Sequence, residues 1–245
     1  MSKHKSLISD YPTKGRVYAS AGYCFFGFGL GPLLLTFFGV GFELTVAEEI
    51  WAQIIFYIVN AVAAICIFRR YLWDSFSYYV QLYFREFIAR VADGVVLTLM
   101  VAGVVYGIGT WAKSPLAMQG VLPIVEVNLF ALPSAIIENH LILGMICMVF
   151  ITPFSTSLLY YATGFARTCS HNPVRAYLLM AFILAIPGIV NALTFWPWEE
   201  EIILYLVQLP IHLIACRTYQ KADTIWAPIV SHMIVNLLAS LMYLF

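Results

Sequence analysis

The sequence predicts an all-α protein, a polytopic transmembrane helical bundle of about seven spans. Hydrophobic residues make up 62% of the chain and charged residues only 11%, whereas soluble domains average about 45–50% and about 25%. Apolar stretches long enough to cross a membrane recur along the chain, and the charged residues between them alternate in sign. A soluble fold of this size has no interior that could hide the apolar surplus, so lipid must solvate much of the surface.

Each predicted span is close to the roughly 20 apolar residues that a helix needs to cross the hydrocarbon core. The first is long and rich in glycine, which favours close helix packing. The sixth is short and contains Pro210, which predicts a kink or a tilt. The seven stretches are 17–42, 50–68, 91–111, 141–164, 174–196, 202–216 and 225–245.

The charged residues predict the orientation of these spans. Twelve of the 13 Lys and Arg residues fall on alternate loops and therefore on one side of the membrane; only Lys113 falls on the other. The opposite loops are acidic, as in the run Glu199–Glu201. Basic loops stay in the cytoplasm, so we expect a cytoplasmic N-terminus and a C-terminus outside.

Three regions are expected along the chain. Residues 1–16 are polar and form a cytoplasmic tail, and residues 17–127 carry the N-terminal membrane helices. Within them, segment 74–90 is too polar to span and predicts an amphipathic helix on the cytoplasmic surface. Residues 128–245 form the second membrane region. The formal net charge of zero gives no pull toward nucleic acid, so the lipid bilayer is the expected partner.

The last span carries the most informative polar residues. His232 and Asn236 are four residues apart and so share one helical face. At 1.5 Å per residue, His232 lies about 10 Å inside the cytoplasmic end. An imidazole at that depth needs a partner. It is either one half of an interhelical hydrogen bond, or a metal ligand or catalytic group.

The segment that holds this pair resembles a known family. TIWAPIVSHMIVNLLASL looks like the closing motif of the CPBP membrane proteins, an Ile-Trp-Ala-Pro-Ile lead-in followed by His-x-x-x-Asn. These are the CAAX-protease and bacteriocin-processing (Abi) proteins, related to the type II CAAX prenyl endopeptidase. The similarity covers about residues 128–242, and residues 1–127 match only in layout. The resemblance implies a multi-pass protein of a bacterial inner (cell) membrane.

The resemblance also implies a chemistry. Active members are intramembrane metalloendopeptidases, in which a Glu-Glu-x-x-x-Arg motif supplies the glutamate that activates water. The histidine of a Phe-x-x-x-His motif and that of the closing motif hold the metal, taken as zinc. The closing asparagine steadies the oxyanion. By this resemblance His232 and Asn236 are the retained catalytic residues, and His232 is the candidate metal ligand.

The first two motifs are degenerate in this sequence. Thr156 and Ser157 take the glutamate positions, Tyr161 takes the arginine position, and Ile186 takes the place of the second histidine. A hydroxyl cannot replace a carboxylate as base near neutral pH, and a catalytic zinc usually needs three protein ligands. We therefore expect a pseudoenzyme without zinc, in which residues 155–157 and the neighbouring tyrosines hydrogen-bond to His232 and Asn236.

Three functions follow from these observations. The first is a degenerate CPBP-type protein that binds a membrane protein or peptide as a scaffold, regulator or immunity-like protein. The second is an active endopeptidase with rearranged ligands, such as His232, His212 and an unassigned glutamate, that cleaves a membrane, prenylated or leader peptide. The third, a transporter or channel component, is disfavoured because the charged residues lie near the span ends; Asp93, for example, is expected either to form a local ion pair with Arg90 there or to snorkel to the interface. A carboxylate near His232 would distinguish the second function from the first.

Overall fold

The structure, a computed structural model, describes residues 21–23, 46–81, 83–111, 141–165, 169, 172–194 and 198–244 of the 245-residue chain. These ranges are almost entirely helical and contain no β-strand, which confirms the predicted all-α class. Within the described residues, three helical stretches are long and apolar enough to cross a membrane: Ile54–Ser75, Phe84–Val104 and Leu141–Thr163. These stretches indicate that the protein associates with a membrane.

Two long helices form the described N-terminal part. Helix α3 spans Val46–Ser75 and α4 spans Phe84–Trp111, and the π-helical segment η3, Phe76–Gln81, joins them. Both helices extend beyond the predicted stretches 50–68 and 91–111. The predicted first span and the tail 1–16 lie outside the described residues, apart from a helical turn at 21–23.

The prediction of one surface helix over 74–90 is wrong. The structure divides this segment among the end of α3, η3 and the first turns of α4. The reason is that its apolar side chains have a protein surface to cover: Val80 and Phe87 pack with Ala227, at the start of the last helix. Burial against that helix covers part of the segment's apolar surface, while Tyr83, Phe84 and Ile88 stay exposed.

The C-terminal part is a broken rod followed by three helices. The rod alternates between α and π geometry through α8 (Leu141–Ile146), η4 (Cys147–Ile151), α9 (Thr152–Thr156) and η5 (Ser157–Phe165). Then come α11 (Pro173–Thr194), α12 (Trp198–Ala222) and α13 (Trp226–Leu244), on the predicted stretches 174–196, 202–216 and 225–245. Helix α12 contains Pro210 and extends beyond the predicted stretch at both ends.

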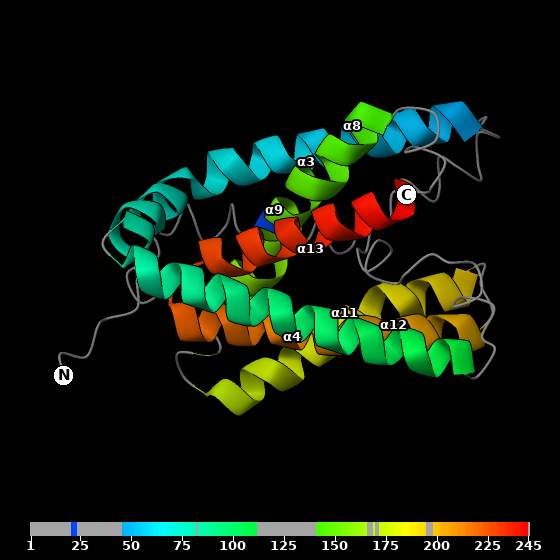
Figure 1. Cartoon of the computed structure of the whole chain (residues 1–245). Helices are drawn as coiled ribbons and strands as arrows, with labels where there is room; N and C mark the ends of the chain where they lie inside the picture. Colours follow the sequence, from blue (N-terminus) through cyan, green and yellow to red (C-terminus); the bar gives the residue numbers. More distant parts are fainter. Residues whose placement is uncertain are drawn as a thin grey trace.

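Helix α13 occupies the middle of this arrangement, between α3 and α4 (Figure 1). It contacts α4 and α12 as well as η4 and α9 of the rod. The largest buried cluster joins α3, η5, α11 and α12 through aromatic side chains, which include Phe68, Tyr161, Phe165 and Tyr219. Through these contacts, helix α13 touches much of the described bundle.

The described helices carry apolar side chains outside and polar ones inside. Exposed positions include Met100 and Val104 on α4 and Leu178 and Phe182 on α11, each with more than 60% of its surface accessible. Asn60, His212 and Asn236, in contrast, are at most 1% exposed. Water solvates such an outer surface poorly and lipid solvates it well.

Helices α4, α12 and α13 approach one another closely at Gly94. A Cβ atom there would lie 2.8 Å from Thr218 Oγ1 and 3.0 Å from Ser231 Oγ. Both hydroxyls, like that of Thr98, donate to the carbonyl four residues earlier in their own helix. Small residues whose polar groups are satisfied locally allow helices in lipid to pack at short range.

We expect Gly94→Ala to weaken this packing. Both Gly94→Ala and the control Gly103→Ala gain about 1 kcal/mol of helix propensity, but only the first crowds a neighbour, since nothing lies within 4 Å of a Cβ at Gly103. Overpacking costs about 1–3 kcal/mol. Thermal unfolding in detergent should therefore show Gly94→Ala melting below Gly103→Ala, and equal melting temperatures would contradict the assigned contact.

Candidate functional site

The start of α13 is attached to the end of α3. The Trp226 indole N–H donates to the Leu72 carbonyl at 2.9 Å, and the hydroxyls of Ser75 and Thr224 lie 2.8 Å apart. The Trp226 ring also packs edge-on against Phe76. Pro228, in the first turn, costs little because the N–H groups of that turn have no partner within the helix. The Ile-Trp-Ala-Pro lead-in thus fixes where His232 lies.

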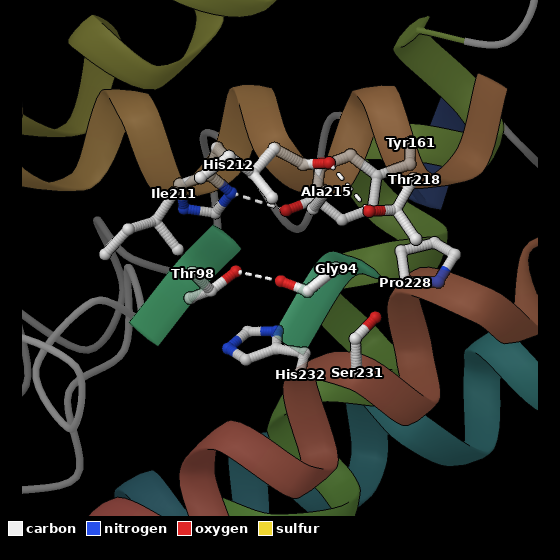
Figure 2. A pocket seen from close by; sticks show the side chains of 11 residues that line it. Gly94, Thr98, Tyr161, Ile211, His212, Ala215, Thr218, Pro228, Ser231 and His232 are labelled. Carbon is white, nitrogen blue, oxygen red and sulfur yellow. Dashed lines mark hydrogen bonds between the residues drawn. The ribbon is translucent and has the colours of Figure 1, made fainter. Parts of the chain in front are cut away.

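His232 lines a small cavity enclosed by η5, α4, α12 and α13 (Figure 2). Its volume is about 20 Å³, counted as space for the centre of a water molecule, and one ordered water needs roughly 10–15 Å³ on that measure. The Nε2 atom of His232 is buried and has no hydrogen-bond partner among the described residues. The polar side chains of the lining are Thr98, Tyr161, His212, Thr218, Ser231 and His232.

Tyr161 and His212 form a buried hydrogen bond at this cavity. The Tyr161 hydroxyl lies 2.7 Å from His212 Nδ1, and both residues are 1% exposed. The Tyr160 ring packs at 5.4 Å from the imidazole. The tyrosine at the family's arginine position therefore links η5 to α12 (Figure 2). A histidine inside a span needs a partner, which is a signal for this pair that the sequence carries, but the sequence could not show which residue that partner is.

The other degenerate positions are not part of the cavity lining. Thr156 and Ser157 are buried where α9 meets η5, and the Ser157 hydroxyl has no partner among the described residues. Ile186 falls within α11, and its side chain is outside the described set. Of the four substituted positions, the described structure brings only Tyr161 to the cavity of His232.

Asn236 contacts the rod instead of the hydroxyl cluster that the sequence suggested. Its Nδ2 donates to the main-chain carbonyl of Met148 in η4 at 2.8 Å, and the residue is fully buried. The expected hydrogen bonds from residues 155–157 to Asn236 and His232 are absent among the described side chains. The Asn236 side-chain amide bonds to a backbone acceptor in the π-helical segment η4 instead.

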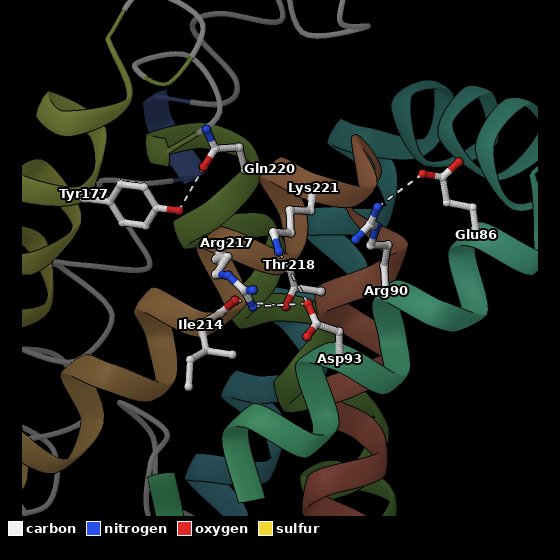
Figure 3. Close-up of polar contacts among 9 residues, drawn as sticks. All are labelled: Glu86, Arg90, Asp93, Tyr177, Ile214, Arg217, Thr218, Gln220 and Lys221. Carbon is white, nitrogen blue, oxygen red and sulfur yellow. Dashed lines mark hydrogen bonds and ion pairs between the residues drawn. The ribbon is translucent and has the colours of Figure 1, made fainter. Parts of the chain in front are cut away.

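The carboxylate nearest in sequence to the cavity lining is held elsewhere. Asp93, next to Gly94, accepts from Arg217 on α12 at 3.1 Å and lies 3.9 Å from Lys221 (Figure 3). The predicted pairing of Asp93 with Arg90 is wrong, because Arg90 reaches back along α4 to Glu86. Among the described residues, no carboxylate lines the cavity, and no three His, Cys, Asp or Glu side chains are grouped so that they could hold a metal.

A catalytic zinc of the family type does not fit the donors that the described residues bring to this cavity. They offer two imidazoles, one of which bonds through Nδ1 to Tyr161, together with hydroxyls. Catalytic zinc sites take three protein ligands from His, Asp, Glu or Cys and need a general base nearby. The described arrangement can hold a water molecule by hydrogen bonds, but among the described residues it offers no carboxylate in the place of the glutamate that activates water in active members of the family.

We expect Asn236→Ala to lower stability, because it removes the side-chain link between α13 and η4. Interhelical hydrogen bonds in membrane proteins contribute about 0.6 kcal/mol on average and about 1.7 at most. Ser240→Ala is the matched control: Ser240 is equally buried one turn later but bonds within its own helix, to the Asn236 carbonyl. Chemical unfolding in detergent should rank Asn236→Ala below Ser240→Ala, and the reverse order would count against the link.

Comparison with known proteins adds no relative. No family model, no curated protein and no solved structure matches the chain. The likeness of the closing helix to the CPBP proteins therefore stays a prediction, and the function is inferred from the helices and the cavity described above.

Proposed function

We propose that the chain is a multi-pass protein of the cell membrane, a degenerate relative of the CPBP endopeptidases that acts by binding, as a scaffold, regulator or immunity-like protein. One observation carries this proposal: the cavity at His232 has no described carboxylate in its lining, and a Tyr161–His212 contact occupies one side of it. A binding role needs a helical bundle with a defined arrangement in the membrane but needs no catalytic base. The described helices form such a bundle.

The lengths of the last three helices support several passes. At 1.5 Å per residue, the 22 residues of α11, the 25 of α12 and the 19 of α13 extend about 28 Å or more, close to the ~30 Å hydrocarbon core. The charge at one end of the bundle supports the orientation, because Arg217 at the end of α12 pairs with Asp93 near the start of α4. We infer from the basic ends that this side is cytoplasmic.

The second candidate, an endopeptidase with rearranged ligands, has one observation in its favour: His212 and His232 line the same cavity. Two imidazoles would need a third ligand and a carboxylate base to hydrolyse a peptide. Among the described residues, none of the carboxylates reaches the lining. We therefore place binding first.

Metal analysis distinguishes the two candidates. We expect the detergent-purified protein to contain far less than one zinc per chain and His232→Ala to leave that content unchanged. The measurement is elemental analysis by mass spectrometry, with Asn236→Ala as a control that changes the same helix outside the cavity lining. Near-stoichiometric zinc that is lost in both His232→Ala and His212→Ala, but kept in Asn236→Ala, would overturn the binding proposal.

Reporter fusions test the orientation. A fusion after Ala222, at the end of α12, should place the reporter in the cytoplasm, and a fusion after Phe245 should place it outside. Alkaline phosphatase is active only outside, and green fluorescent protein serves as its cytoplasmic counterpart at each position. If both fusions report the same side, α13 is not a span and the seven-span topology is wrong.

A further inference from the structure

A group of basic side chains lies where α4 and α12 meet near their charged ends (Figure 3). Asp93 is the one carboxylate between Arg217, at 3.1 Å, and Lys221, at 3.9 Å. At 3.9 Å the Lys221 ammonium is beyond hydrogen-bond length from Asp93. All three side chains are more than one-third exposed. Asp93 thus orients Arg217 and leaves the donors of Lys221 open to another acceptor.

Arg90 adds a third cation one turn earlier on the same face of α4. Its Nε atom is buried and has no partner among the described residues, and its contact with Glu86 is long, at 3.5 Å. Among the described residues, the carboxylates that Arg90, Arg217 and Lys221 face are Asp93 and Glu86, so these three cations exceed them by one positive charge. We call these three cations the basic cluster.

An apolar stripe continues from this cluster along α4. Val96, Met100 and Val104 follow Asp93 at spacings of three, four and four residues, so they share its face. Their exposed fractions are 49%, 62% and 61%. A ligand that covers both the cluster and the stripe needs an anionic head and an apolar tail.

We propose that the basic cluster binds the phosphate of an anionic phospholipid whose acyl chains lie along the stripe of α4. Basic pockets between membrane helices on the cytoplasmic side suit anionic headgroups, and guanidinium and ammonium groups both bond to phosphate oxygens. This site rests on the proposed function in one respect, namely that the basic end of the bundle lies at the cytoplasmic interface.

The site would also support the cavity. Asp93 precedes Gly94 and Arg217 precedes Thr218, and both of these neighbours line the cavity of His232. A phosphate held by cations from both α4 and α12 ties these helices together next to Gly94 and Thr218, where the two helices lie close to each other. Anionic lipid then stabilises the seam between α4 and α12, and neutral lipid does not.

Lipid affinity tests the proposal. The purified chain is placed in nanodiscs of phosphatidylcholine with increasing phosphatidylglycerol, and native mass spectrometry counts the retained phosphatidylglycerol. We expect Lys221→Gln and Arg90→Gln each to weaken retention roughly threefold to tenfold, and Lys221→Arg to restore it. The control is Arg70→Gln, which removes a cation that faces only Asp74, at 3.7 Å on its own helix. The control should retain phosphatidylglycerol like the unchanged chain.

Each remaining outcome counts for or against the site. Equal retention of phosphatidylglycerol in all variants overturns the lipid site. The multi-pass proposal is tested separately: it is still supported if the protein leaves the membrane only when detergent is added. If inorganic phosphate in excess displaces phosphatidylglycerol and raises the melting temperature as much, the ligand is a free anion and the lipid assignment is overturned. Unchanged melting of the two Gln variants in pure phosphatidylcholine, together with lower melting than the parent in phosphatidylglycerol, supports the site over misfolding.

Discussion

The approach of α4 to α12 and α13 at Gly94 is the contact on which the described bundle depends. In lipid, helices gain little from hiding apolar surface from each other, so close packing and hydrogen bonds must hold them. A side chain at this point would meet Thr218 and Ser231. Because Gly94 has no side chain, the three helices can lie close together beside the small cavity of His232. The ion pair of Asp93 with Arg217, one residue along each helix, holds the same seam from the end.

The sequence predicted the helices well and their mutual contacts poorly. Runs of apolar residues located α3, α4 and the rod, because length and hydropathy are local properties of the chain. The segment 74–90 was misread because its amphipathic pattern is the same whether its apolar face meets lipid or the start of α13. Periodicity shows that a face is buried, but not what buries it.

The same limit applies to the candidate site. His232 was recognisable as a buried imidazole from its depth in the span, and the structure lines the cavity with it. The pairing of Tyr161 with His212 could not be recognised from the sequence, because residues 161 and 212 are far apart in sequence and no spacing rule connects them. Asp93 forms its ion pair with Arg217 and not with Arg90 for a similar reason, because the partner of Asp93 depends on how α12 packs against α4.

The π-helical turns of the rod have a consequence of their own. Main-chain carbonyls of the rod accept hydrogen bonds from side chains elsewhere: Met148, in the π-helical segment η4, accepts from Asn236, and Ser155, in α9, accepts from Tyr23 at 3.2 Å. A backbone carbonyl is present whatever the side chain at that position. The rod can therefore exchange residues such as Thr156 and Ser157 without losing these attachments, so the position of the rod in the bundle depends little on the side chains at those two positions.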